Sequence, residues 1–398
     1  MINSDFRSHF PFFKNEANWV YLDSAATTLK PQVLIDETMA FYQSAGSVHR
    51  SQYDLAQTEA YEMARDLVVK RFNVESRNAV IWTSGTTHAI NLVANGLSDE
   101  IKAGDDIIVS VAEHHANFIP WQQLAERKKA NLIVLPVDEN YYIDINRLSE
   151  SLSSKTKIVA FNLVSNVTGV RQPVEKLIPI IREKSSAKIL LDMAQAVNSE
   201  QIDIQQLDAD FYAFSAHKMY GPTGVGVLTG KLQSLATIRP LFFGGKMLTD
   251  ISEQKLILAE LPYRLEAGTP NIAGIISFGK VLAWLEQWDL TILNNSLYQL
   301  AGKCQNRLQQ YANIQILKSN VITPTISFNF SNHHHADIAT ILTEQKIALR
   351  TGEHCAKPYL RYLEKTGTLR ISLAHYNTGE DITRFFNALD MTLQLLED

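Results

Sequence analysis

The sequence predicts an α/β fold: a mostly parallel seven-stranded sheet with helices on both faces, followed by a smaller C-terminal α+β domain. Short apolar runs alternate with helical patterns through the middle of the 398-residue chain, which is typical of βαβ units. Several of these runs are apolar throughout, as strands covered on both faces should be. The predicted strands are Ala79–Thr83, Asp106–Val111, Leu132–Val137, Ile158–Asn162, Lys188–Asp192, Phe211–Ser215 and Gly226–Thr229.

The last third of the chain is patterned differently. Ile326, Phe328 and Phe330 alternate with polar residues, which predicts a half-buried strand. The elements expected after it are a helix at 337–345, strands at 347–351 and 368–374, and a final helix begun by Thr378 and Asp381. This mixture predicts the smaller α+β domain.

Pro262, Gly268 and Pro270 interrupt the pattern between the two parts of the chain. We therefore expect a large domain over residues 18–262 and a small domain over residues 263–398. Residues 1–17 are expected to form an N-terminal segment that packs with the small domain.

The composition excludes several classes of protein. With 37 basic and 42 acidic residues the net charge is −5, so there is no basic footprint for nucleic acid or an anionic membrane. No apolar run is long enough to cross a bilayer, and the N-terminus lacks the pattern of a signal peptide. Two cysteines, Cys304 and Cys355, cannot form a disulfide framework. A reducing, cytoplasmic setting is the expectation.

Ser84, Gly85, Thr86 and Thr87 follow the strand that ends at Thr83 and open a predicted helix. The unpaired N–H groups and the dipole of a helix N-terminus make such a segment suitable for an anion such as a phosphate. Ser and Thr are also the usual N-cap residues, so a simple cap explains the segment when it is taken alone.

Asp192 ends one apolar strand, and Lys218 follows another in the segment Ser215-Ala216-His217-Lys218. A carboxylate at the end of a buried parallel strand points into the crevice where α/β proteins bind ligands, and there it suits a protonated pyridine nitrogen. A desolvated lysine is a candidate for a Schiff base. Taken singly, Asp192 also fits a turn cap and Lys218 a solvated surface charge.

Together these features describe one kind of site. A phosphate cradle, a carboxylate for a ring nitrogen and an amine for an aldehyde are what pyridoxal 5′-phosphate (PLP) requires. A dinucleotide is disfavoured, because no G-x-G-x-x-G follows the early strands. We therefore expect PLP as the cofactor.

Motifs along nearly the whole chain resemble the class V aminotransferase family of fold-type I PLP-dependent enzymes. Within it the chain is most similar to the SUF-type cysteine desulfurases, cysteine sulfinate desulfinase and selenocysteine lyase, because Arg-x-Gly-x-His-Cys-Ala is characteristic of that branch. The matching segments are 21–28, 48–50, 113–117, 164–166, 211–218, 266–271 and 350–356. The chain departs from the family pattern at Ser84, Met193, Ala216 and Phe243, none of which is a reacting group.

The resemblance implies that Lys218 holds PLP and then acts as the base for the substrate's Cα proton. Asp192 would keep the pyridine nitrogen protonated, and Gln195 would bond the phenolic oxygen. His114 would act as a catalytic residue that stacks on the ring and can also shuttle protons near neutral pH, although it also fits a helix-start histidine beside His115. The residues implied for the phosphate are Thr86, Thr87, Ser215 and His217, with Thr269 from the second subunit of a homodimer.

The same resemblance implies a substrate site. Asn166 and Arg370 would bind the substrate carboxylate, since a guanidinium matches a carboxylate with paired hydrogen bonds. His49 and Arg50 would lie near the substrate, and Arg350 would support the loop that carries Cys355.

Cys355 would be the nucleophile that receives sulfur, acting as a thiolate in an electropositive setting that His354, Arg350 or Lys357 would supply. Cys304, within a helical pattern, fits a small buried side chain. The triple histidine His333–His335 lacks the accompanying ligands of a metal site.

The activity that follows is conversion of cysteine to alanine, with sulfur passed from Cys355 to a SufE/CsdE-type acceptor protein, as in iron–sulfur cluster assembly. A lyase that prefers selenocysteine or cysteine sulfinate is the alternative. A transaminase and a non-catalytic scaffold with the same fold are further readings of the sequence.

Overall fold

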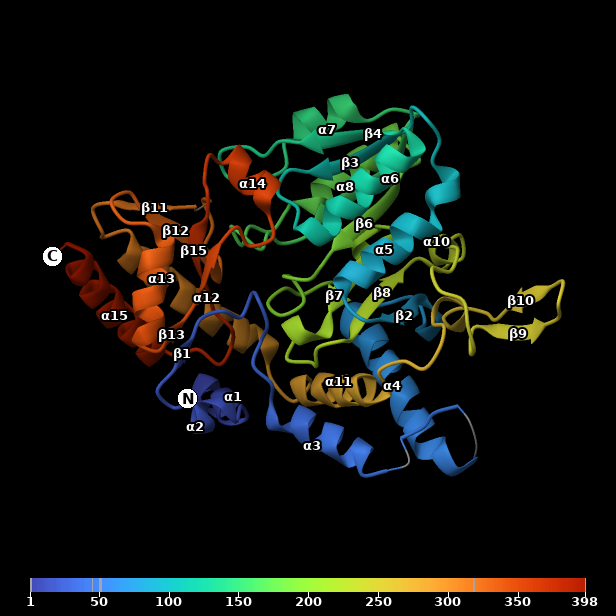
Figure 1. Ribbon diagram of the computed structural model, residues 1–398, viewed down its shortest axis with the longest axis horizontal. Helices are drawn as coiled ribbons and strands as arrows, with labels where there is room; N and C mark the ends of the chain where they lie inside the picture. The colour runs from blue at the N-terminus through green and yellow to red at the C-terminus, as the bar shows by residue number, and fades with distance from the viewer. Residues whose placement is uncertain (1, 45, 50–51, 318, 398) are drawn as a thin grey trace.

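The computed structural model describes residues 2–44, 46–49, 52–317 and 319–397, so Arg50 lies outside the described residues. Its body is a seven-stranded sheet in the order β2-β8-β7-β6-β5-β3-β4 (Figure 1). β8 runs antiparallel to β2 and β7, and the other neighbouring pairs are parallel. The strands are β2 (Val80–Thr83), β3 (Asp106–Ser110), β4 (Asn131–Leu135), β5 (Thr156–Asn162), β6 (Lys188–Asp192), β7 (Phe211–Ser215) and β8 (Gly226–Gly230).

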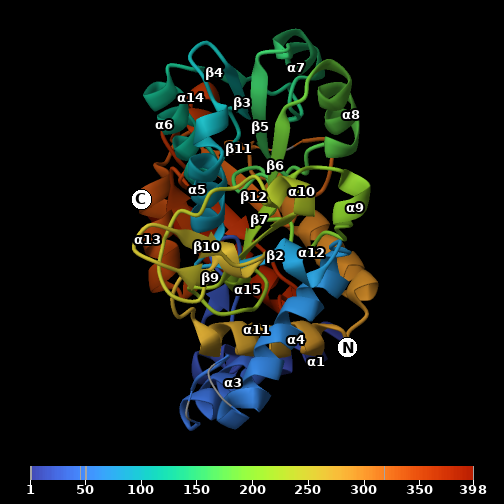
Figure 2. The ribbon, with the colours of Figure 1, turned by 90° about the vertical axis from the view of Figure 1, so that its right-hand side faces the viewer.

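Helices cover both faces of this sheet, with α5 and α6 on one face and α8 on the other (Figure 2). The strands are buried along their length except β4, which is an edge strand and is partly exposed. The main helices of this part are α3 (Gln32–Tyr42), α4 (Leu55–Phe72), α5 (Thr86–Gly96), α6 (Ile119–Lys128), α7 (Ile145–Ser151), α8 (Val174–Lys184) and α11 (Ile272–Leu285). The predicted α/β architecture is confirmed.

The C-terminal part contains an antiparallel sheet in the order β11-β12-β15-β14. Its strands are β11 (Ile314–Ile316), β12 (Thr325–Phe330), β14 (Arg350–Gly352) and β15 (Thr368–Ser372). The helices packed with it are α12 (Leu290–Leu308), α13 (His335–Glu344) and α15 (Gly379–Glu397). The buried side chains of α14 (Lys357–Tyr362) instead pack in a separate small cluster with Val111, Val137 and Val167. α15 begins with the expected capping pair: the Thr378 N–H donates to Asp381 Oδ2 at 3.0 Å and the Asp381 N–H to Thr378 Oγ1 at 3.4 Å.

The domain division between residues 262 and 263 stays a prediction. Helix α11 follows this boundary in the sequence, but its side chains pack with the large sheet. The buried side chains of α11 join the core of the large sheet and pack against α3 and α4. The second core gathers Val20 and Leu22 with residues from Leu297 onward. β1 (Val20–Tyr21) reaches this second core by pairing in parallel with β13 (Ile347–Ala348).

The N-terminal helix α1 (Ile2–Ser8) contacts both parts of the chain. Phe6 joins the larger core beside Trp284, with ring centroids 5.0 Å apart. Arg7 pairs with Asp381 of α15 at 2.8 Å. The segment thus ties the start of the last helix to the core of the large sheet.

The sequence does not predict the exposed hairpin of β9 (Leu248–Ile251) and β10 (Leu256–Leu258), which projects from one end of the molecule in Figure 1. In the described part of the chain, no helix is long and apolar enough to cross a membrane.

Candidate active site

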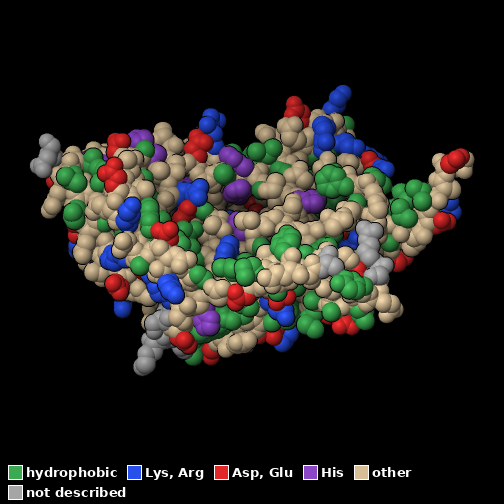
Figure 3. Space-filling view, turned by 60° about the horizontal axis from the view of Figure 1, so that its bottom comes forward, with side chains coloured by type: hydrophobic (Ala, Val, Ile, Leu, Met, Phe, Trp, Pro, Cys, Tyr) green, Lys and Arg blue, Asp and Glu red, His purple; other side chains and the backbone are tan. Residues whose placement is uncertain are grey.

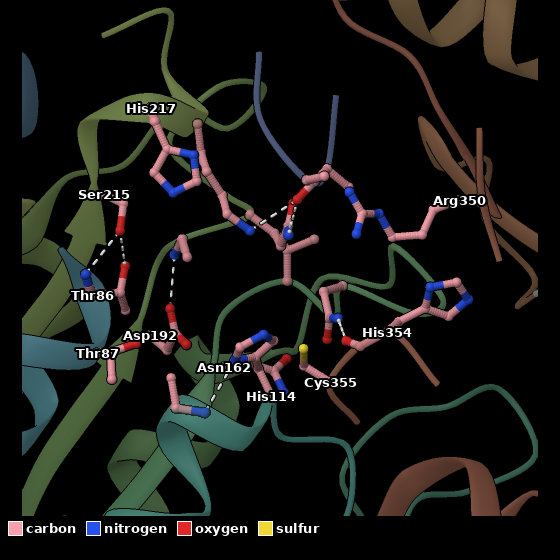
Figure 4. A pocket seen from close by; sticks show the side chains of 18 of the residues that line it. Thr86, Thr87, His114, Asn162, Asp192, Ser215, His217, Arg350, His354 and Cys355 are labelled. Carbon is pink, nitrogen blue, oxygen red and sulfur yellow. Dashed lines mark hydrogen bonds between the residues drawn. The ribbon is translucent and has the colours of Figure 1, made fainter. Parts of the chain in front are cut away.

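A cavity of about 400 Å³ lies where the carboxyl ends of β5, β6 and β7 face the small domain. The space-filling view is hollowed near its middle, where histidine side chains gather (Figure 3). The large domain contributes strand-end residues, and β14, β15 and the loop before α14 contribute residues from the other side (Figure 4). The lining includes Thr86, Thr87, His114, Asn162, Asn166, Asp192, Gln195, Ser215, His217, Lys218, Arg350, His354, Cys355 and Arg370.

The first turn of α5 forms one end of the cavity. The Thr86 N–H donates to Ser215 Oγ at 2.8 Å, and the two hydroxyl oxygens lie 2.7 Å apart, which fixes the start of α5 against the end of β7. Thr87 is exposed toward the cavity. Burial lowers the pKa of His217 to about 4, so its imidazole is neutral near pH 7. Unpaired helix N–H groups and hydroxyls gathered here suit a phosphate.

Two glycines allow the close approach on which this cradle depends. A Cβ on Gly226 of β8 would meet Gly85 Cα at 2.4 Å. Only a residue without a side chain lets the backbone before α5 lie directly against β8.

Lys218 lies in a short 3₁₀ turn (Ala216–Lys218) directly after β7, and its Nζ donates to the Ala25 carbonyl at 2.9 Å. Burial lowers the pKa of Lys218, the Arg370 cation lowers it further, and Asp192 opposes both. A lysine whose neutral form is favoured is a good nucleophile toward an aldehyde.

Asp192 is buried at the end of β6, where it accepts a hydrogen bond from the Ala194 N–H at 2.9 Å. Burial raises the pKa of this carboxyl group, and the Ala194 N–H and Lys218 act in the opposite direction. A carboxylate held out of water in this way is stabilised by a cationic hydrogen-bond donor. A protonated ring nitrogen is such a donor.

His114 and Gln195 complete the wall on either side of Asp192. His114 Nδ1 accepts from the Ala116 N–H at 3.0 Å, so its other ring nitrogen is available to the cavity. Burial, reinforced by the Lys218 cation, lowers the pKa of His114 to about 4, and the ring is therefore neutral. The Gln195 side-chain amide donates to the same Ala25 carbonyl as Lys218, at 2.9 Å.

Arg370, on β15, is a buried cation in the cavity wall, with 3% of its side chain exposed. It donates to the Asn166 carbonyl at 2.9 Å and to Asp23 Oδ1 at 3.2 Å. Arg350 donates to Asp23 Oδ2 at 2.9 Å. Two guanidinium groups thus share one carboxylate, which leaves one net positive charge to attract an anionic group.

The loop that carries Cys355 is held on both sides. His354 and Cys355 both have positive φ, 51° and 54°, a conformation that non-glycine residues rarely adopt. The Asn166 side-chain amide donates to the His354 carbonyl at 2.7 Å, and the His115 N–H donates to the Cys355 carbonyl at 2.7 Å. The Cys355 side chain is exposed beside His114 (Figure 4). Its thiol is therefore presented by a loop that the large domain fixes in place.

The charges around Cys355 differ from the sequence expectation. Burial, reinforced by Arg370, lowers the pKa of His354 to about 3, so this imidazole is uncharged near pH 7. Lys357 pairs with Glu353 at 3.0 Å. Arg350 and Arg370 are the cations that interact electrostatically with Cys355. Of the three residues that the sequence suggests, His354, Arg350 and Lys357, it is Arg350 that interacts with Cys355, together with Arg370.

Two predicted residues do not line the cavity. Thr269 is exposed in the loop before α11. His49 pairs with Glu62 at 3.1 Å and packs edge-on against Tyr61 and Tyr263, with ring centroids 5.5 and 5.8 Å away. The expectation that Thr269 reaches the site of a second subunit stays a prediction.

Sequence reasoning missed three groups. Asp23 links the two arginines, and it lies in the matching segment 21–28, where it was assigned no role. Asn162 ends β5 as Asp192 ends β6, so its strand-end position was the available signal. The Ala25 carbonyl, which accepts from Lys218 and Gln195, has no side-chain signal at all.

Comparison with known proteins agrees with this geometry. The model of the aminotransferase class-V family matches residues 20–385. This chain belongs to that family. A probable cysteine desulfurase of Haemophilus influenzae is 55% identical over 98% of this chain and 90% of its own length. The cysteine desulfurase CsdA of Escherichia coli is 41% identical over 99% of this chain and 98% of its own.

Solved structures show the same similarity. The crystal structure of E. coli CsdA in its S-sulfonic acid form has a TM-score of 0.93 at 40% identity and covers 99% of this chain and 98% of that one. The apo cysteine desulfurase of Thermococcus onnurineus NA1 has a TM-score of 0.92 at 30% identity, with the same coverage of both chains.

The cofactor of this chain is PLP, as the sequence predicts. The chemistry of the residues that line the cavity fits PLP. Burial lowers the pKa of Lys218 to about 8, which makes its neutral amine easier to form, Asp192 is a buried carboxyl group beside the cavity, and Asn162 Oδ1 is buried with no donor among the described residues. The first turn of α5 and Lys218 line the same cavity, so one bound cofactor can contact both.

Proposed function

We propose that this protein is a cysteine desulfurase that converts L-cysteine to L-alanine and moves the sulfur onto Cys355 as a persulfide. The observation that carries the proposal is that the exposed thiol of Cys355 lines the same cavity as Lys218, Asp192 and Arg370. The relatives that are named cysteine desulfurases, at 41% and 55% identity, support it.

Bound PLP supplies an electron sink that activates the substrate at Cα and Cβ. Lys218 holds the cofactor covalently, and its freed amine removes the Cα proton, since burial and Arg370 favour the neutral amine. Asp192 would keep the ring nitrogen protonated. His114, a neutral imidazole, would pack on the ring, and Gln195 would donate to the phenolic oxygen. Thr86, Thr87, Ser215 and His217 would hold the phosphate.

The substrate is oriented by its carboxylate. Arg370 and Asn166 bind it through N–H donors. Arg370 Nε is buried and has no acceptor among the described residues, and Asn166 would use its side-chain NH2 group, which here donates to the His354 carbonyl. The positive charge left over by the Arg350–Asp23–Arg370 group favours an anion there. With its carboxylate fixed, the substrate's side chain is directed toward the loop of Cys355.

The transfer step balances without any added oxidant. The Cys355 thiolate attacks the sulfur of the substrate, and an S–S bond forms as the Cβ–S bond breaks. The electron pair of the broken bond stays on the carbon side and takes up a proton at Cβ, which becomes the methyl group of alanine. One cysteine and one enzyme thiol give one alanine and one enzyme persulfide.

The Cys355→Ser variant tests this step, with Cys304→Ser as the matched control because Cys304 is fully buried in α12. We expect Cys355→Ser to lose alanine formation from cysteine by at least about 100-fold, while Cys304→Ser keeps it. Normal turnover by Cys355→Ser would refute the persulfide step. If that variant instead retained its rate on selenocysteine or cysteine sulfinate, whose leaving groups depart without a thiol, the enzyme would serve those substrates as well.

We also infer a sulfur acceptor protein, of the SufE/CsdE type, as the recipient. A second cavity of about 520 Å³ has Cys355 in its wall together with Ile119, Pro120, Gln123 and Arg127, and it is suited to a partner that brings its own thiol. Service to iron–sulfur cluster assembly in the cytoplasm is the setting that we propose for this transfer.

A homodimer is part of the same proposal, because Thr269 lies outside the cavity of its own chain. Mixing a Lys218→Ala chain with a Thr269→Val chain tests it. In a dimer, one of the two sites of the mixed species keeps both residues and recovers activity. Failure of the mixture to exceed either parent would contradict a shared site.

A further inference from the structure

A cavity of about 450 Å³ lies apart from the active site and shares no lining residue with it. It is formed where the C-terminal end of α4, the segment before α9 (Ile204–Leu207) and the start of α12 meet. Its lining is mainly polar and consists of Lys70, Arg71, Asn73, Glu200, Gln201, Ile202, Asp203, Trp288, Asp289, Leu290, Thr291 and Asn294.

Arg71, in the last turn of α4, is the unusual member of this lining. Its side chain is half-buried, and it has no hydrogen bond or ion pair with any described residue. Its Nε is shielded from solvent without an acceptor. Burial lowers the pKa of the guanidinium, with Glu286 acting in the opposite direction. Because arginine stays protonated in proteins, this is a partly desolvated charge that makes no direct ion pair in the described part of the chain, and Glu286 acts on it only at longer range.

Trp288 adds a second unpaired donor. The indole Nε1 is buried and has no acceptor among the described residues. The ring is fixed by edge contacts with Phe6 and His9, at centroid distances of 5.1 and 5.4 Å, so it cannot turn away without breaking that cluster. An indole N–H only donates, which makes the missing partner an acceptor.

The carboxylates nearby are already bound elsewhere. Asp203 caps α9 through the Gln206 N–H at 3.0 Å, and Asp289 caps α12 through the Thr291 N–H at 3.0 Å. Glu286 pairs with Lys70 at 2.8 Å. Glu200 accepts from the Tyr298 hydroxyl at 2.9 Å. None can move to Arg71 without giving up a cap or a partner.

We propose that this cavity binds a small anion carrying a carboxylate or phosphate group, with Arg71 and Trp288 as its donors. A guanidinium presents paired donors to either group, and the indole N–H supplies a further one. The volume lies in the range of sites for small metabolites rather than single ions.

Titration of the PLP-loaded enzyme tests the proposal, because bound PLP already fills the phosphate cradle of the active site. Inorganic phosphate and succinate are the two probes, added at constant ionic strength and followed by calorimetry and by the midpoint of thermal unfolding. We expect saturable binding of at least one probe. The stronger probe identifies whether phosphate or carboxylate is the preferred group.

Three variants make the result specific. Arg71→Met should weaken the binding at least about tenfold, and Trp288→Phe should weaken it several-fold. Arg77→Met is the control, since Arg77 is an exposed arginine that pairs with Asp66 outside the cavity. Without added anion, Arg71→Met should unfold at the same temperature as the wild type or a higher one, because it removes an unpaired charge. Equal binding by Arg71→Met and wild type, or no saturable binding of either probe, would overturn the proposal.

Discussion

Replacement of Asp23 by asparagine tests the charge arrangement at the substrate end of the active site. The Asp23 carboxylate accepts from Arg350 and from Arg370, and the two arginines differ in burial. Arg370 has 3% of its side chain exposed, whereas Arg350 has 49% exposed. Asparagine keeps the size of the side chain and removes the negative charge.

The expected loss of stability comes mainly from Arg370. Removing one partner of a buried ion pair costs about 3–5 kcal/mol, because the remaining charge stays desolvated. The half-exposed pair with Arg350 adds at most about 1 kcal/mol. Asparagine retains an oxygen acceptor, so we expect about 3 kcal/mol, at the lower end of this range.

Urea unfolding of the PLP-loaded enzyme near pH 7.5 measures this loss, with Arg350→Met as the control that should cost less than about 1 kcal/mol. The KM for cysteine should fall rather than rise in Asp23→Asn, because two uncompensated guanidinium groups attract the substrate carboxylate more strongly. An Asp23→Asn protein within about 0.5 kcal/mol of wild type would show that the Asp23–Arg370 pair does not stabilise the fold as the burial of Arg370 requires.

Two further predictions concern the cofactor site and its support. Gly226→Ala should weaken PLP binding, measured by visible absorbance, because its Cβ would lie 2.4 Å from Gly85 Cα. Gly379→Ala is the control, since no atom lies within 4 Å of a Cβ at that position, and it should bind PLP as the wild type does. Equal affinity of the two variants for PLP would show that the close approach of Gly226 and Gly85 does not matter for the cofactor site. Burial raises the pKa of Glu113 to about 8, so wild-type stability is lost as pH rises from the ordinary carboxyl range toward 8. The free energy of unfolding of Glu113→Gln, relative to that of the wild type, should therefore rise by up to about 1.4 kcal/mol per pH unit over that window. Urea unfolding at pH 5.5 and 7.5 measures this. If the free-energy difference between variant and wild type were the same at both pH values, Glu113 would not titrate on unfolding in this range.

The sheet was predictable because its strands carry a strong local signal. β6 and β7 match their predicted bounds, and both are buried along nearly their whole length. The antiparallel direction of β8 was not predictable, because an apolar run in the sequence does not show which way its strand runs relative to its neighbours. The hairpin of β9 and β10 escaped prediction because its side chains are mostly exposed, so neither strand shows an alternation of buried and exposed residues.

The candidate site was predictable where chemistry sits at a strand end or in a family motif, as for Asp192, Lys218 and Cys355. The residues that hold the site together were harder to predict from the sequence. Asp23 and Arg370 are 347 residues apart in sequence, and only the pairing of β1 with β13 and the bridge of Asp23 to Ser372 bring them together. Of the three cations suggested for the Cys355 loop, His354 is held neutral by burial, and this burial depends on the packing of the whole loop, which the sequence does not show.

The position of Cys355 has a consequence for how the enzyme and its acceptor must meet. The residue belongs to the walls of both the 400 Å³ and the 520 Å³ cavities, and its loop is pinned by Asn166 and His115. Under the sulfur transfer that we propose, Cys355 would take up sulfur from the first cavity and release it into the second, and rotation of its side chain about χ1 would be enough without a long swing of the loop. The acceptor that we propose would then have to bring its own thiol into the 520 Å³ cavity. Selection among thiols in the cell would rest on the shape of that cavity rather than on the reactivity of the persulfide.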